Sequence, residues 1–262
     1  MIQACKKMKL SRQAFYKKKQ SHHPLDLTQA VNQVRNRCGN IGGRKLHHVL
    51  RPSIAMGRDR FFGWLREHGL LVERKRRFTR TTDSKHGFGY APNRIKGRPV
   101  VRPDQVWVSD ITYLRTENGF CYLALTMDLF SRKILGYDVN DTLEMVGVQR
   151  ALEMAQRQAV NTIGTIHHSD RGSQYASPRY IQILKKKGML NSMTASGDCY
   201  ENAAAERLNG ILKQEYGLGL TFESKQLAAK AVKQAVNAYN QYRPHWALHL
   251  ETPEQVYQQF NI

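Results

Sequence analysis

The second part of the chain begins with three successive runs of β-branched and aromatic residues. These runs predict strands over 106–114, 120–128 and 133–139. The Asn118-Gly119 pair between the first two runs is typical of a tight hairpin turn. We therefore expect three consecutive strands that pair in antiparallel order.

After these strands, helical and extended patterns alternate. Apolar positions at helical spacing, together with short apolar runs, predict helices 142–159, 177–187, 200–215, 224–242 and 253–260, and strands 163–168 and 189–194. A strand meander followed by helix, strand, helix, strand and helix is the order of a ribonuclease-H-like fold. In that topology the first and fourth strands lie side by side. The sequence thus predicts an α/β fold with a mixed five-stranded sheet and flanking helices.

The first hundred residues show a different, all-helical pattern. Apolar spacing predicts helices over 27–38 and 57–68, with another between them and a short one over 12–19. We interpret residues 1–73 as a helix-turn-helix-type DNA-binding region. Its third helix would present three basic side chains to DNA, namely Arg58, Arg60 and Arg66. The alternative is a small helical bundle with a solvated, charged face.

Charge strengthens the DNA hypothesis. The chain carries a net charge of +20, of which +19 falls in residues 1–100 and only +1 in residues 101–262. Such an excess suits a polyanion, and nucleic acid is favoured over a membrane surface because no basic helix has a broad apolar face. A merely soluble basic protein is the alternative. A basic cluster after the third helix adds four candidate DNA contacts, Arg74, Lys75, Arg76 and Arg77.

Composition also divides the chain. Basic residues, glycines and prolines mark 74–103 as an extended linker, which leaves 104–220 as the ribonuclease-H-like core and 221–262 as a C-terminal helical extension. The four cysteines are widely spaced without a C-x-x-C pair, which argues against a structural zinc site. The apolar runs are too short to span a membrane. We expect a cytoplasmic, nucleoid-associated protein with reduced thiols.

Three acids stand at informative places in the predicted topology. Asp110 lies within the first strand, where an unpaired buried charge is costly. Asp170 follows the fourth strand, and Glu206 stands in a later helix, with 35 residues between the two acids. Three clustered carboxylates repel one another unless cations neutralise them, and hard oxygen ligands select Mg²⁺ or Mn²⁺. Two ions roughly 4 Å apart can activate an attacking hydroxyl and stabilise a leaving oxygen in phosphoryl transfer.

The helix that carries Glu206 adds polar neighbours on nearly the same face. Lys213 lies two turns further on and could contact a phosphate, and Asn209 shares this face as a candidate DNA contact. Gly210 would let DNA approach closely. For any one of the three acids alone, a surface or capping role is the alternative.

At these residues the sequence resembles a known family. It is similar to the second-frame catalytic transposase of the IS-three family of bacterial insertion sequences, within the DDE integrase and transposase superfamily. The resemblance covers nearly the whole chain. It rests on Val106–Tyr113, His168–Tyr175, Asn202–Glu206 with Leu212-Lys213, Tyr239-Asn240-x-Tyr242-Arg243-Pro244-His245, and Thr252-Pro253. Glu201 stands where relatives commonly have Asp, and Arg207 where they commonly have Ser.

The resemblance implies that Asp110, Asp170 and Glu206 are the catalytic, metal-binding triad and that Lys213 contacts DNA beside it. It also implies cleavage at an element end, followed by attack of the released 3′-hydroxyl on another phosphodiester. The family often fuses this frame to a smaller upstream helix-turn-helix protein, so this chain is either a partial enzyme or a self-sufficient variant. Synapsis of two DNA ends points to a homo-oligomer on double-stranded DNA.

Two other functions compete with transposition. A catalytically silent DNA-binding regulator would bind DNA after EDTA treatment and never cleave it, but a degenerate copy would be free to lose an acid. A ribonuclease-H-type nuclease would prefer RNA–DNA hybrids. The basic N-terminal region and the spacing of the acids disfavour it.

Overall fold

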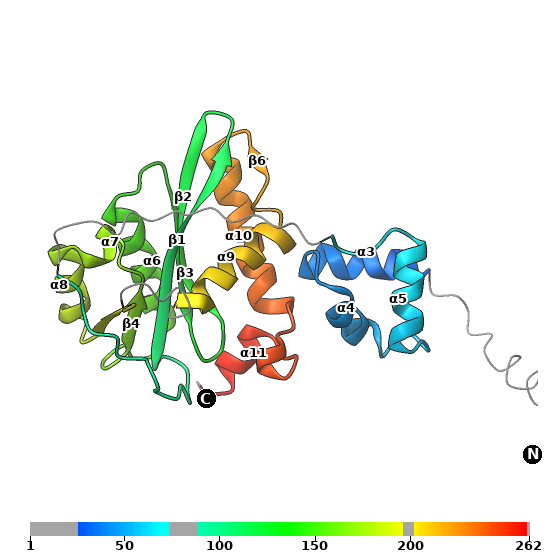
Figure 1. Cartoon of the computed structure of the whole chain (residues 1–262), viewed down its shortest axis with the longest axis horizontal. Coiled ribbons are helices and arrows are strands. Elements are labelled where there is room, and N and C mark those ends of the chain that lie inside the picture. Colours follow the sequence, from blue (N-terminus) through cyan, green and yellow to red (C-terminus); the bar gives the residue numbers. More distant parts are fainter. Residues whose placement is uncertain (1–25, 74–88, 196–201, 261–262) are drawn as a thin grey trace, which may run out of the picture. The chain divides into compact units, whose positions relative to one another are not determined.

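The computed structural model describes residues 26–73, 89–195 and 202–260. The chain divides into two compact units, one formed by Met1–Arg37 with Gly42–Leu71 and the other by Cys38–Ile41 with Val72–Ile262. Figure 1 shows the elements of both units. The boundaries expected at 73, 103 and 220 stay predictions.

The first unit contains three described helices. They are α3 (Leu27–Cys38), α4 (Gly43–Leu50) and α5 (Arg58–Glu67), so the three helices expected over this part are present. Their apolar faces are fully buried at Val31, Leu46, Phe61 and Leu65. Burial of these aliphatic and aromatic side chains stabilises the packing of the three helices. The helix expected over 12–19 and the cluster from Arg74 to Arg77 lie outside the described residues.

A mixed sheet forms the centre of the second unit. Its main strands run in the order β3-β2-β1-β4-β5, with β1 at Val106–Thr116, β2 at Gly119–Asp128, β3 at Ile134–Asn140, β4 at Ile166–Ser169 and β5 at Leu190–Met193. The first three strands pair in antiparallel fashion, and β1, β4 and β5 pair in parallel. The five predicted strands and the adjacency of the first and fourth are confirmed. A sixth strand, β6 (Thr221–Phe222), pairs with β1 and was not predicted.

Helices cover both faces of the sheet (Figure 1). One face packs against helices α6 (Met145–Gln158), α7 (Ser173–Ala176) and α8 (Pro178–Lys186). The other packs against α9 (Ala203–Glu215) and α10 (Lys225–Tyr242). The chain continues through a short 3₁₀ turn, η2 (Trp246–Leu248), and α11 (Pro253–Gln258). Of these helices α7 was not predicted, because four residues give too little periodicity.

Side-chain alternation along β1 divides the core into two layers. Val106 and Val108 pack with α9 and α10, whereas Trp107 and Ile111 pack with α6 and α8. Successive side chains of a strand point to opposite faces. Asp110 therefore belongs to the face that α9 covers.

The basic segment before β1 forms neither helix nor strand over residues 89–105. It is nonetheless attached to the sheet at β5. The Arg94 backbone N–H donates to Ser192 Oγ at 2.9 Å, and Arg94 Nε donates to the Asn191 carbonyl at 3.0 Å. This part of the expected linker thus follows the edge of the sheet.

The C-terminal helix α11 contacts the segment that leads into β1. Thr252 caps it in a reciprocal capping box with Gln255. Tyr257 donates its hydroxyl to Asp104, which also accepts from Trp107 Nε1 at 2.9 Å. An ion pair of 2.9 Å between Lys133 and Glu254 joins α11 to the turn before β3.

Candidate active site

The end of β4 creates an open edge beside the middle of β1. The parallel pairing of β1 with β4 runs from Val106 to Ser109, where Ser109 lies opposite Ser169. The residues that follow Ser109 and Ser169 are Asp110 and Asp170. Pairing of β1 with β6 begins only at Arg115. No described strand pairs with this side of β1 between Asp110 and Leu114, and α9 crosses there.

Contacts with α9 and its own backbone fix the Asp110 carboxylate. Asn209 Nδ2 donates to Asp110 Oδ2 at 2.7 Å, and the Ile111 backbone N–H donates to Asp110 Oδ1 at 2.9 Å. Glu206 lies one helical turn before Asn209 on α9 and is exposed. The two strands and α9 thus bring the three acids into one neighbourhood.

The other two carboxyl groups affect the pKa of Asp110. Burial, the negative charge of Asp170 and that of Glu206 together raise the pKa of Asp110 to about 8, against the opposing effect of its two hydrogen bonds. Each charge therefore disfavours the ionised form of Asp110. A cation bound here would remove that repulsion.

Asp170 is held by the turn that follows β4. Its Oδ1 accepts a hydrogen bond of 3.1 Å from the Gly172 backbone N–H at the start of α7. A Cβ at Gly172 would stand 3.1 Å from the same oxygen, so a side chain there would crowd the carboxylate. The neighbouring Arg171 donates from Nε to the Thr194 carbonyl at 2.8 Å and lies 4.3 Å from the centre of the Tyr90 ring.

A chain of buried polar side chains runs through Ser109, the residue before Asp110, and His167, three residues before Asp170. Ser109 Oγ contacts His167 Nε2 at 2.9 Å and Thr126 Oγ1 at 3.0 Å, and the Tyr180 hydroxyl contacts the same His167 nitrogen at 3.1 Å. Burial, with a smaller effect of the adjacent His168, lowers the pKa of His167 to about 3. The ring is therefore neutral and joins β4 to β1 and α8 by hydrogen bonds, and Ser109 extends the chain to β2.

Lys213 reaches the same edge of β1. Its Nζ lies 4.3 Å from the centre of the Tyr113 ring, and that ring meets Phe120 edge to face at 5.3 Å. Burial lowers the pKa of Lys213, while the nearby Tyr113 and Asp110 act in the opposite direction. Sequence reasoning missed Tyr113, because no local pattern indicates a lysine partner one hundred residues away.

The remaining expected DNA contacts are arranged differently. Asn209 is buried and its amide is directed at Asp110, so the structure places it in the acid cluster. Arg58, Arg60 and Arg66 are exposed on α5 of the first unit, where Arg58 pairs with Asp59 at 2.8 Å.

The chemistry of the acid cluster fits a divalent cation. Carboxylate oxygens are the ligands that Mg²⁺ and Mn²⁺ prefer, and Mg²⁺ commonly takes only one or two of them while keeping water and phosphate oxygens. Within the described ranges, no three His, Cys, Asp or Glu side chains lie close enough to enclose a metal ion. Asp110, within β1, and Asp170, just after the end of β4, would be the first ligands, with Glu206 approaching from α9.

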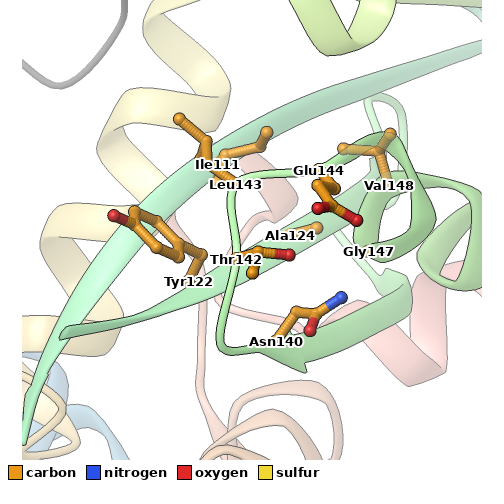
Figure 2. Close-up of a pocket in the computed structure, with 9 residues that line it drawn as sticks. All are labelled: Ile111, Tyr122, Ala124, Asn140, Thr142, Leu143, Glu144, Gly147 and Val148. Atoms are coloured by element: carbon orange, nitrogen blue, oxygen red, sulfur yellow. The ribbon is translucent and has the colours of Figure 1, made fainter.

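A separate pocket lies on the opposite face of the sheet (Figure 2). It is formed by β1, β2, β3 and the start of α6, and its lining residues are Ile111, Tyr122, Ala124, Asn140, Thr142, Leu143, Glu144, Gly147 and Val148. Neither Asp110 nor the other two acids line it. Because Ile111 and Asp110 point to opposite faces of β1, this pocket is distinct from the acid cluster.

Comparisons with known proteins agree with this architecture. Residues 100–199 and 187–253 each match an integrase core domain family. The chain is 34% identical over 252 residues to a 31 kDa protein of insertion element IS600 of Shigella sonnei, covering 92% of each chain. It is 35% identical over 194 residues to the transposase InsF of insertion sequence IS3A of Escherichia coli, covering 73% of this chain and 67% of the relative.

The chain belongs to the IS3 (IS-three) family of insertion-sequence transposases. Its fold is also that of a chain in the simian T-cell lymphotropic virus intasome in complex with a PP2A regulatory subunit. That likeness has a TM-score of 0.51 at 17% identity, and covers 83% of this chain and 70% of the other. In the described part of this transposase, no helix has both the length and the apolar character needed to cross a membrane.

Proposed function

We propose that this protein is the DNA transposase of a bacterial insertion sequence. It cleaves DNA at the element end and joins the released 3′-hydroxyl to a second phosphodiester. Asp110, Asp170 and Glu206 are the acids that hold the catalytic metal ions. The observation that carries this proposal is the β1–β4 register, which ends with Ser109 opposite Ser169, so that the next residues are Asp110 and Asp170.

The residues of the site have distinct tasks in this proposal. Two Mg²⁺ or Mn²⁺ ions, when bound, supply Lewis acidity to the attacking and leaving oxygens of the phosphodiester. Asp110, within β1, and Asp170, just after β4, would hold them, and Asn209 fixes the orientation of the Asp110 carboxylate. Lys213, half-buried beside Tyr113, places a positive charge near a substrate phosphate.

Double-stranded DNA is the proposed substrate, as element end and as target. The basic residues of the first unit, including exposed Arg58, Arg60 and Arg66, bind the element end, and the cluster from Arg74 to Arg77 adds contacts to the phosphate backbone. Two ends have to be held together for insertion, so we propose a homo-oligomer on DNA. Further end recognition would come from a fused or separate upstream-frame helix-turn-helix protein, unless the chain is a self-sufficient variant.

The test uses duplexes that carry the terminal repeats flanking the gene. Purified protein with Mg²⁺ is expected to nick the element end and to join it to target DNA, and EDTA is expected to abolish both products. RNA–DNA hybrids are expected to stay intact. Asp170→Asn should retain DNA binding but lose both reactions. Full activity of Asp170→Asn would refute the assignment of the acids.

A further inference from the structure

Several polar side chains of the C-terminal segment from Tyr239 to His245 are buried. Arg243 is 2% exposed, Tyr239 is 1% exposed, and Asn240 and His245 are also buried. Polar side chains are seldom buried so fully unless they are paired. Their partners therefore show what the segment does.

Asn240 anchors the end of α10 to the sheet. Its Oδ1 accepts from the Ile134 backbone N–H at 2.9 Å, and its Nδ2 donates to the Ile134 carbonyl at 2.9 Å. A side-chain amide thus occupies both hydrogen-bonding groups of a β3 residue. The position of α10 along the sheet is fixed at this point.

Arg243, three residues later, forms an ion pair with Glu215, the last residue of α9. Its Nε and Nη2 donate to the two carboxylate oxygens of Glu215 at 2.6 and 2.7 Å. Its Nη1 donates to His245 Nε2 at 2.9 Å, and the guanidinium carbon lies 5.7 Å from the centre of the Tyr239 ring. A bidentate pair of this kind fixes orientation as well as distance.

Glu215 and the active-site residues share one rigid helix. Glu206 and Glu215 are nine residues apart, which separates them by roughly 14 Å along α9 and by about 180° around it. The apolar contacts of α9 come from Ala205, Leu208 and Leu212. The bidentate ion pair adds geometric specificity to these apolar contacts.

We propose that Glu215 and Arg243 are positioning residues that hold α9 in the register placing Glu206 against Asp110 and Asp170. The connection runs from β3 through Asn240 and Arg243 to Glu215. This inference rests on the proposed function, because it assumes that Glu206 binds metal. It assigns a role to a C-terminal motif that touches none of the reacting atoms.

The test compares two buried ion pairs. Glu215→Gln keeps the shape of the side chain and removes its charge, and Arg243→Lys keeps the charge but loses the two-pronged contact. The matched control is Glu254→Gln. It breaks the Lys133–Glu254 pair, whose side chains are 10% and 14% exposed and which joins α11 to the turn before β3 instead of to α9. Thermal unfolding checks that each variant folds.

Calorimetric titration of Mn²⁺ into the full-length protein is the main measurement. Glu215→Gln and Arg243→Lys are expected to weaken Mn²⁺ binding about 10-fold, as loss of supporting residues does at other metal sites. Both should need correspondingly more Mg²⁺ for half-maximal cleavage, while metal-free DNA binding stays unchanged. Glu254→Gln should leave the Mn²⁺ affinity unchanged despite lower thermal stability.

The outcomes separate the two proposals. If the unmodified protein neither binds Mn²⁺ nor cleaves element ends, the proposed function fails. If it does both and Glu215→Gln binds Mn²⁺ with unchanged affinity, the positioning role is refuted. An equal loss of Mn²⁺ affinity in Glu254→Gln would also refute it, because the effect would then be general destabilisation.

Discussion

Asn209 donates its amide to Asp110 at 2.7 Å, so a residue of α9 orients an acid of β1. The bond crosses 99 positions of sequence and joins the two elements that supply Asp110 and Glu206. Asp110 Oδ1 is held at the same time by the Ile111 backbone N–H. Both oxygens of this carboxylate therefore have fixed directions before any ligand arrives.

The first prediction concerns this bond. Asn209→Ala should slow element-end cleavage about 10- to 100-fold, because a hydrogen bond to a charged group contributes roughly 1.5–3 kcal/mol. Rates measured at saturating DNA would show the loss. Gln214→Ala, at an exposed position of the same helix, should cleave at the normal rate. An unchanged rate in Asn209→Ala would mean that the orientation of Asp110 is set by other groups.

The second prediction separates the charge of Lys213 from its placement. Lys213→Met should lower the slope of log affinity against log salt by about 1, as loss of one phosphate contact does. Tyr113→Leu should weaken DNA binding a few-fold without changing that slope, since a cation–π contact contributes about 0.5–2 kcal/mol and the charge stays. Tyr113→Phe keeps the ring and is expected to bind normally. Equal slopes in Lys213→Met and the unmodified protein would exclude this phosphate contact.

The sequence predicted the main elements of the second unit because their hydrophobic periods are long. It also predicted that the first and fourth strands are neighbours, which follows from topology once the order of elements is known. Boundaries were less accurate. The fourth strand was expected from residue 163 but begins at Ile166, because Gly164 adopts a left-handed turn with φ of +81°.

The features that the sequence did not predict depend on contacts between segments that are distant in the chain. The two residues of β6 form a strand only because β1 extends past β4, and no pattern of two residues can indicate that. The helical face of Glu206, Asn209 and Lys213 could be read from spacing. That the Asn209 amide meets Asp110 could not be read, since it requires the crossing of α9 over β1.

The third prediction concerns pH. The pKa of His167 is lowered from 6.5 to about 3, so the neutral ring stabilises the fold fully above pH 6.5 and this contribution is lost as the pH falls towards 3. The linked free energy is roughly 5 kcal/mol in total, of which about 3 kcal/mol is lost by pH 4. Urea unfolding of the unmodified protein and His167→Gln between pH 7 and pH 4 would measure it.

The difference in unfolding free energy between the unmodified protein and His167→Gln is the quantity that reports on His167. The pKa of Asp128 is raised to about 6, mainly by burial, so its effect on stability runs in the opposite direction over part of the same range. Subtraction removes that effect, because Asp128 is present in both proteins. The stability advantage of His167 over Gln should shrink as the pH falls. A constant difference would show that the ring is not held neutral.

The last prediction contrasts two glycines. A Cβ at Gly136 would lie 1.9 Å from the Ala151 carbonyl oxygen, so β3 and α6 would have to separate. Gly136→Ala should therefore destabilise the fold by at least about 3 kcal/mol. At Gly210 a Cβ would meet nothing within 4 Å, and Gly210→Ala should stabilise α9 by about 0.5–1 kcal/mol. Urea unfolding measures both changes.

Gly210 also tests how closely DNA approaches α9. It shares the helical face of Glu206 and Lys213, so an added methyl group would stand between the helix and a bound strand. Gly210→Ala is expected to bind element ends more weakly while its Mn²⁺ affinity stays unchanged. Fluorescence anisotropy with labelled ends would measure the change. Normal DNA binding by this more stable variant would place the DNA backbone away from this part of α9.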